Sequence, residues 1–303
     1  MGIHVPTGAL LLSVLLNLAA GASPRVSPAA ASPVPPGTAA HRDLAYVSGG
    51  HPRQKLDLYL PESKGRLPLL IYIHGGAFRG GDKGDGPPLE YLDEGYALAS
   101  INYRLSQHAI FPAQIEDCKA AVRWLRAHAA EYRLDPDRFA VGGTSAGGHL
   151  AAMVGTTGHV KELDVGEHLD QSSRVQAVVD YFGPTDFLRM DAHRLPGGMA
   201  HDGPDSPESQ LVGGAIQENP KKVARANPIT YVTAEAPPFL VVHGNRDPIV
   251  PHHQSEILVD ALREAGVPVI FYTVVGGGHG QFDDPKAPEL TKEFLARHLR
   301  PAR

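Results

Sequence analysis

From residue 43 onwards, short apolar segments alternate with longer stretches that have the period of an amphipathic helix. This alternation limits the possible folds most strongly, because it is typical of a mostly parallel β-sheet covered by helices on both faces. The first two segments alternate apolar and polar residues, which predicts an antiparallel edge, whereas several later ones are apolar throughout, as interior parallel strands are. The expected strands are residues 44–47, 56–60, 69–73, 97–102, 139–141, 175–181, 239–243 and 269–274. The expected helices are residues 113–132, 146–155, 253–265 and 289–299.

The alternation continues almost to the end of the chain, which indicates one domain. A chain of 303 residues is long enough for one large domain or for two ordinary ones. We expect a single domain over residues 43–303. Residues 183–237 interrupt its pattern, since they are rich in Gly and Pro and weakly periodic. An insertion of this length is more often a lid or a pocket wall than a slack loop, so we predict a small cap there.

The N-terminus carries an apolar run, residues 9–20, that ends in the small residues Ala20-Gly21-Ala22. The run is short for a bilayer span, and the small residues are typical of a signal-peptide cleavage site. We predict a signal peptide over residues 1–22, cleaved after Ala22, and a disordered Pro- and Ala-rich linker over residues 23–42. The protein is then secreted or periplasmic. Because no Lys or Arg precedes the run, an uncleaved anchor or a misassigned start codon is an alternative.

The overall charge and the cysteine content exclude several classes of protein. The net charge of −5 provides no basic surface, so we expect neither nucleic-acid binding nor stable membrane association. Cys118 is the only cysteine, which excludes an internal disulfide and a cysteine-based metal site. Its place in an expected amphipathic helix indicates a buried thiol.

A Gly-x-Ser-x-Gly motif, residues 143–147, lies between an expected strand and an expected helix. So abrupt a turn strains the backbone of the serine and requires neighbours without bulk, which the glycines provide. The turn raises the hydroxyl of Ser145 above the sheet, and the N-terminus of the next helix points at it. Ser145 is therefore the candidate nucleophile, and the backbone N–H of Ala146 is a candidate donor to an oxyanion. A glycine-rich turn without function is the alternative for the motif alone.

A His-Gly-Gly sequence, residues 74–76, follows the third expected strand. Two adjacent glycines allow backbone N–H groups to face a bound carbonyl oxygen without interference from a Cβ atom. Gly75 and Gly76 are thus expected to form an oxyanion hole with Ala146, in which one donor typically contributes about 3 kcal/mol. We interpret His74 as a structural residue that holds this loop.

Candidates for the acid and the base follow two later strands. Asp247 lies where the chain leaves the carboxyl end of the expected strand 239–243, a location typical of active-site residues in parallel sheets. His279 lies in a glycine-rich turn after the last expected strand, where its ring can reach the serine with one nitrogen and the aspartate with the other. A turn-capping role is the alternative for Asp247. His252 and His253 are alternative bases, but they open an expected helix.

These motifs, in the order serine, aspartate, histidine, resemble the α/β-hydrolase superfamily over residues 56–298. Within it, the chain is similar to the carboxylesterases with a His-Gly-Gly oxyanion loop, which include feruloyl- and acetylxylan-esterase relatives and are related to hormone-sensitive-lipase-like esterases. The latter carry a third glycine in the loop, where this chain has Ala77, and this favours the former group. Other matches to the pattern of the group are Asn-Tyr-Arg at 102–104, Phe-Pro at 111–112, Asp-Pro-Asp-Arg at 135–138 and Pro-Pro at 237–238.

The resemblance implies an α/β-hydrolase fold, with a mostly parallel eight-stranded sheet flanked by helices and a small cap insertion. It also implies a serine carboxylesterase that cleaves short-chain or aromatic esters through an acyl-enzyme, with Asp247 orienting His279 and His279 activating Ser145. The expected substrate is a small-molecule or polysaccharide-linked ester, and neither a cofactor nor a metal is expected. We expect Phe78 and the 183–237 insertion to shape the substrate pocket.

Two other function classes fit the same fold. A peptidase of the prolyl-oligopeptidase-like type shares the residue order, but such enzymes usually carry a large propeller domain, and only about forty residues precede the first expected strand here. A non-catalytic binding protein typically lacks the serine or the histidine, and both are present. A long-chain lipase would need a more apolar lid than residues 183–237. The sequence does not distinguish acetyl, feruloyl, polyester and small scavenged esters, and it does not determine the oligomeric state.

Overall fold

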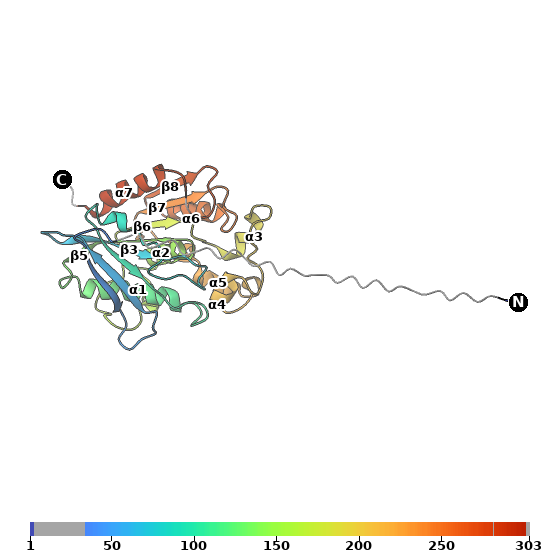
Figure 1. The fold of residues 1–303 in the computed structure, drawn as a ribbon, viewed down its shortest axis with the longest axis horizontal. Coiled ribbons are helices and arrows are strands. Elements are labelled where there is room, and N and C mark those ends of the chain that lie inside the picture. Colours follow the sequence, from blue (N-terminus) through green and yellow to red (C-terminus); the bar gives the residue numbers. More distant parts are fainter. Residues whose placement is uncertain (3–33, 281, 301–303) are drawn as a thin grey trace.

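The structure, a computed structural model, describes residues 1–2, 34–280 and 282–300. Its strands form one eight-stranded sheet in the order β1-β2-β4-β3-β5-β6-β7-β8 (Figure 1). The pairs β1–β2 and β2–β4 are antiparallel and all later pairs are parallel, so the predicted fold class is confirmed. The strands are β1 (Ala39–Ala45), β2 (Lys55–Leu60), β3 (Leu67–Ile73), β4 (Ala97–Ile101), β5 (Leu134–Thr144), β6 (Ala177–Tyr181), β7 (Phe239–Gly244) and β8 (Val269–Val274).

Helices cover both faces of the sheet (Figure 1). Residues of α1, α2 and α6 share one apolar cluster with one face of the strands, whereas α7 and a short 3-10 helix, η1 (Leu89–Tyr91), pack on the other face. The helices are α1 (Ala113–Ala127), α2 (Ala146–Thr156), α3 (Met190–His193), α4 (Pro207–Val212), α5 (Pro220–Ala226), α6 (His253–Glu264) and α7 (Lys286–Leu299). The helix predicted over residues 113–132 ends earlier, at Ala127, because the chain turns there towards β5.

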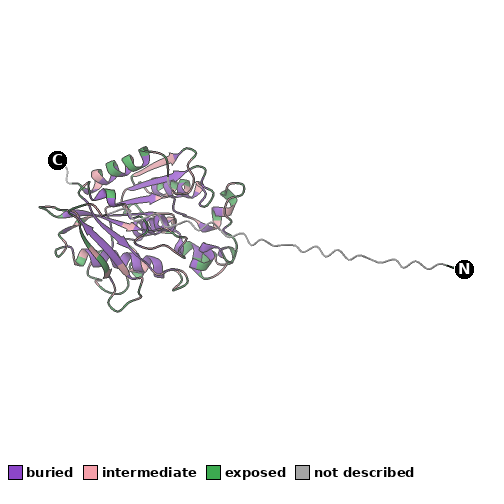
Figure 2. Ribbon diagram, viewed as in Figure 1, coloured by how far each residue is buried: buried purple, intermediate pink, exposed green. Residues whose placement is uncertain are grey.

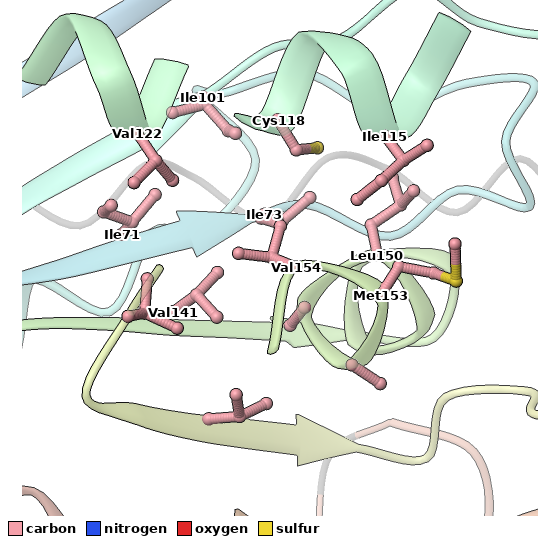
Figure 3. Packing of buried hydrophobic residues seen from close by; sticks show 14 of the residues in the cluster. Ile71, Ile73, Ile101, Ile115, Cys118, Val122, Val141, Leu150, Met153 and Val154 are labelled. Atoms are coloured by element: carbon pink, nitrogen blue, oxygen red, sulfur yellow. The ribbon is translucent and has the colours of Figure 1, made fainter. Parts of the chain in front are cut away.

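Alternate residues of the inner strands point to opposite faces, which explains why these strands are apolar throughout. In β3, Ile71 belongs to the cluster beneath α1 and α2, whereas Leu70 belongs to the cluster beneath α7 and η1. Figure 3 shows Ile71, Ile73 and Val141 packed against α1 and α2. Cys118 lies in the same layer and is buried, which confirms the predicted buried thiol. Figure 2 shows the inner strands buried along their length. Both faces of the sheet therefore contribute to the core.

The first strand begins earlier than the sequence pattern indicates. Ala39 pairs with Leu60 and Ala40 with Tyr59, so residues 39–42, predicted as linker, belong to the sheet. Most side chains of β1 are exposed, so the strand lacks the apolar pattern that reveals a buried one. Residues 3–22 of the predicted signal peptide and residues 23–33 of the predicted linker lie outside the described residues. No helix of the described part of the chain combines the length and apolar character that a bilayer span requires.

The 183–237 insertion consists of the short helices α3, α4 and α5 and the 3-10 turns between them, at the right of Figure 1. Its buried residues Leu211, Ile216 and Val223 belong to the same apolar cluster as the sheet and α2. The predicted cap is therefore a group of short helices that packs on the main core.

Candidate active site

Ser145 connects β5 to α2 in a single residue. Its backbone has a φ of +55°, in the left-handed region that is costly for a residue with a side chain. Its N–H donates to the carbonyl of Tyr181 in β6 at 2.9 Å, which holds the turn against the neighbouring strand. A Cβ atom at Gly143 or Gly147 would collide with the carbonyl oxygen of Ile73. The structure therefore contains the strained serine turn and the close approaches that require its two glycines.

The structure brings Ser145, His279 and Asp247 together from the ends of three strands. The Oγ of Ser145 lies 3.0 Å from Nε2 of His279, and Nδ1 of His279 lies 2.7 Å from Oδ2 of Asp247. A carboxylate only accepts hydrogen bonds, so in the neutral ring Nδ1 carries the proton and donates to Asp247. Nε2 then accepts from the Ser145 hydroxyl, an arrangement that prepares this hydroxyl for deprotonation.

Asp247 is held by several donors in a buried position. The residue is 2% exposed, and its Oδ1 accepts from the backbone N–H groups of Ile249 at 2.7 Å and Val250 at 2.9 Å. Its Oδ2 accepts from Nε2 of His243 at 3.1 Å as well as from His279. Burial alone would raise the pKa of Asp247, but the hydrogen bonds from His243 and His279 outweigh it and hold this pKa well below its ordinary value. The carboxylate is therefore ionised near neutral pH.

His243 supports this aspartate, although no sequence motif indicates it. The residue lies near the end of β7 and is completely buried. Its Nδ1 accepts from the hydroxyl of Ser255 at 2.7 Å, which leaves the proton on Nε2 for Asp247 and for the carbonyl of Val250. Only the four-residue spacing to Asp247 is visible in the sequence, and many unrelated pairs share that spacing.

The alternative bases lie elsewhere. Nε2 of His252 is 3.0 Å from the Thr273 hydroxyl, and the ring of His253 stacks on His193 with 3.5 Å between the centroids. Neither ring is hydrogen-bonded to Ser145 among the described residues. The geometry therefore favours His279.

Gly75 and Gly76 lie beside the serine turn. A Cβ atom on Gly75 would be 2.9 Å from the carbonyl oxygen of Thr144 and 3.4 Å from Cβ of Ser145. Gly76 has a φ of +109°, which favours glycine. Within the part of the chain that the structure describes, the N–H groups of Gly75, Gly76 and Ala146 donate to no backbone carbonyl. Free donors next to a serine hydroxyl are the arrangement that binds an oxyanion.

Phe78 does not reach this site. Its side chain is 1% exposed and packs edge-on against His149 and Phe187, with ring centroids 5.3 and 6.3 Å away. The backbone at Ala77 and Phe78 has φ values of +54° and +59°, so the loop turns back and the ring points into the core. The structure therefore corrects the predicted contact between Phe78 and the substrate. The ring packs in the core and supports the loop from that side.

A pocket of about 870 Å³ adjoins Ser145. It extends along the sheet face that α7 and η1 cover, and Leu70, Gly142 and Val179 of three neighbouring strands line it. The 183–237 insertion contributes Met199 to its wall. The volume lies in the range of small-molecule sites. Among the described residues, no group of three or more His, Cys, Asp or Glu side chains is arranged to hold a metal ion.

The sheet, its strand order and the serine turn define an α/β-hydrolase. The family model BD-FAE matches residues 56–262, and the chain belongs to this family. The predicted resemblance to the carboxylesterases of the superfamily is thereby confirmed.

Similar proteins agree with this assignment. The chain is 34% identical to esterase LipQ of Mycobacterium tuberculosis over 249 residues, which cover 80% of this chain and 57% of LipQ. It is 35% identical to the probable carboxylic ester hydrolase LipM of the same organism over 222 residues, which cover 72% of this chain and 50% of LipM. The chain thus spans about half the length of these curated relatives. A solved structure, a truncated form of a carbohydrate esterase from gut microbiota, has a TM-score of 0.80 and 34% identity, and the match covers 87% of this chain and 97% of that one.

Proposed function

We propose that this protein is a secreted or periplasmic serine carboxylesterase that hydrolyses short-chain or aromatic carboxylic esters. The observation that carries the proposal is the hydrogen-bonded series from Ser145 Oγ through His279 to Asp247, next to a pocket. The names of the similar proteins, esterase and carboxylic ester hydrolase, support the ester-cleaving chemistry. The predicted signal peptide supports export.

The residues support a two-step reaction. His279 removes the proton from Ser145 as Oγ attacks the ester carbonyl, and the N–H groups of Gly75, Gly76 and Ala146 bind the oxygen that becomes negative. His279 then protonates the leaving alkoxide oxygen as its bond to the acyl carbon breaks, so the alcohol departs and the acyl group stays on Ser145. In the second step His279 takes a proton from water as the water oxygen attacks the acyl carbon. His279 then returns this proton to Ser145 Oγ as the bond from Oγ to the acyl carbon breaks, which releases the carboxylic acid and restores the serine hydroxyl. Asp247 stabilises the positive charge on the imidazole in both steps.

The pocket supports an acyl group larger than acetyl. Its volume of about 870 Å³ exceeds what a two-carbon group requires, and its floor is apolar. The carbohydrate esterase among the similar structures supports a polysaccharide-linked ester as one source of substrate. We propose that the acyl group enters the space between the sheet and α7, and that the alcohol faces solvent.

Hydrolysis of p-nitrophenyl esters from acetate to dodecanoate, together with methyl ferulate and an acetylated xylan, tests the proposed function. We expect turnover by the wild-type protein and a loss of about 10⁴-fold or more in Ser145→Ala, because the nucleophile is absent. Circular dichroism of both proteins controls for folding. A folded wild-type protein without activity on any of these esters would refute the proposal.

Gly142 provides a test of the acyl position. A Cβ atom on this residue would be 3.3 Å from Cβ of Val179 and 3.7 Å from Cδ1 of Leu70, so Gly142→Ala narrows the pocket without touching Ser145. We expect activity on octanoate and ferulate esters to fall by about tenfold relative to acetate, because one methyl group in a pocket has an effect of this size. An unchanged ratio would place the acyl group elsewhere.

A further inference from the structure

The guanidinium group of Arg53 lies beneath the loop that carries Gly75 and Gly76. Its Nε donates to the carbonyl of Tyr103 at 2.9 Å. One of its Nη atoms donates to the carbonyl of Gly81 at 2.8 Å and to Oδ1 of Asn102 at 3.0 Å, and the same nitrogen lies 3.0 Å from Nε2 of His74. The arginine side chain is 18% exposed, so these bonds form largely out of water.

The contact with Arg53 determines which nitrogen of His74 carries the proton. A guanidinium group can only donate, so Nε2 of His74 accepts and shares one of the two hydrogens of this Nη atom with another acceptor. Burial lowers the pKa of His74 to about 4, so the ring is neutral near pH 7 and its hydrogen is on Nδ1. This Nδ1 lies 2.7 Å from the carbonyl oxygen of Gly75 and donates to it. The ring of Tyr103 stacks on His74 with 4.6 Å between the centroids, which holds the imidazole plane in place.

The carbonyl of Gly75 and the N–H of Gly76 belong to the same peptide unit. A trans peptide is planar, and its C=O and N–H point in opposite directions. A donor that holds the Gly75 carbonyl therefore also determines where the Gly76 N–H points. The backbone encloses this contact closely, because a Cβ atom at Gly81 would collide with Nδ1 of His74 and with the Gly75 oxygen.

We propose that Arg53 is a positioning residue for the oxyanion hole, which aims the Gly76 N–H through His74 and the Gly75 carbonyl. The proposal rests on the proposed esterase function. Arg53 is not among the residues that line the pocket, so its effect on catalysis is exerted through the loop.

Kinetics of Arg53→Ala test this role. A misaimed donor weakens binding of the transition state more than binding of the substrate, so we expect kcat to fall about 10- to 100-fold with KM within about twofold of the wild type. The affinity for a phenylboronic acid, whose tetrahedral adduct on Ser145 places an oxygen in the oxyanion hole, should fall by a similar factor. Added guanidinium chloride below denaturing concentrations should restore part of kcat. Arg53→Lys keeps the charge but not the fork of donors, and its kcat should lie between the two.

Arg138→Met is the matched control. The Arg138 side chain is 23% exposed, and its guanidinium group bonds to Asp135 and to the carbonyls of Arg66 and Leu299, away from the residues of the loop. We expect this variant to lose stability but to keep its kcat per folded molecule. If Arg53→Ala keeps the wild-type kcat while Ser145→Ala is inactive, the positioning role is wrong and the proposed function stands.

The tautomer of His74 provides a measurement that needs no substrate. Nitrogen-15 NMR of the ring should show hydrogen on Nδ1 in the wild type and a mixture of tautomers in Arg53→Ala or, if that variant does not fold, in Arg53→Met, which also lacks a donor. Identical spectra in all three proteins would overturn the proposal even if no ester is turned over.

Discussion

Asp247 and Asp180 lie near the carboxyl ends of neighbouring strands, β7 and β6, and both residues are buried, with 2% and 0% of their surface exposed. Asp247 accepts two hydrogen bonds at each oxygen and has a lowered pKa. Asp180 accepts one, from the N–H of Gly183 at 2.9 Å, and its Oδ2 has no partner among the described residues. Burial with so little compensation raises the pKa of Asp180 to about 7.

The comparison shows that burial at the same sheet edge does not determine the charge of a carboxyl group. The donors do. The region of Asp247 holds an anion beside an imidazole, which a base requires. The region of Asp180 holds an acid with a raised pKa of about 7 against the first turn of α2, where a Cβ atom on Gly148 would collide with its Oδ1. We therefore interpret Asp180 as a packing residue of the serine turn.

Asp247→Asn should produce the largest effect. The amide presents an N–H₂ group or a weaker acceptor to His279, so the tautomer that serves as a base is lost and kcat should fall about 10⁴-fold. Steady-state hydrolysis of a p-nitrophenyl ester measures this. Asp180→Asn is the control, and its kcat should remain within about tenfold of the wild-type kcat. Equal losses in the two variants would remove the distinction between the two aspartates.

Asp180→Asn should instead change how stability depends on pH. The folded pKa is raised to about 7, so between about pH 4 and pH 7 the folded state binds a proton that the unfolded state has released, and stability falls as pH rises through this window. The variant has no carboxyl group at this position and lacks this loss. Its free energy of unfolding should therefore exceed that of the wild type by a few kcal/mol at pH 8 and by almost nothing at pH 4. Urea unfolding at both pH values tests this. A pH-independent difference would mean that Asp180 is already ionised.

His243→Phe removes one donor from Asp247 and keeps the volume of the ring. We expect a loss of about 2 kcal/mol in the free energy of unfolding at pH 7, the usual contribution of a hydrogen bond to a buried charge. This loss should persist from neutral pH into moderate acid, because the lowered pKa of Asp247 keeps its carboxylate charged well below the ordinary carboxyl range. A loss of the same size when Asp247 is also replaced by Asn would point to packing as its cause.

Ser255→Ala should have the smallest effect, about 1 kcal/mol in unfolding free energy, since its hydroxyl forms one hydrogen bond, with Nδ1 of His243, and none with the Asp247 carboxylate. Denaturant titration measures it. A loss larger than that of His243→Phe would show that the serine supports more of the core than this one contact.

Much of the fold was predictable because buried strands are apolar and helices repeat every 3.6 residues. The predicted strands near β2, β3, β4, β7 and β8 match the structure closely for this reason. The edge strand β1 has no buried face, so its first residues carried no such pattern. The candidate residues Ser145, Asp247 and His279 could also be identified from the sequence, since each follows a strand end in a glycine-rich or turn-forming segment.

The supporting residues were not predictable, because their roles depend on contacts across the chain. Arg53 reaches residues 74, 81 and 102 through one guanidinium group, and no local pattern around it indicates this. The charge state of Asp180 depends on donors that are absent, which a sequence does not display. Phe78 was expected to shape the pocket, but the backbone has positive φ values at residues 77 and 78 and the ring is buried in the core.

The reach of Arg53 from the turn before β2 has a consequence for shortened versions of the protein. The segment that the family model matches, residues 56–262, contains Ser145 and Asp247 but begins after Arg53 and ends before His279. A fragment cut at those limits would also lack β1, β8 and α7. The outer strands of the sheet therefore determine the shortest fragment that keeps the whole candidate site. Residues 56–262 should not be used as limits when the protein is truncated or fused to another one.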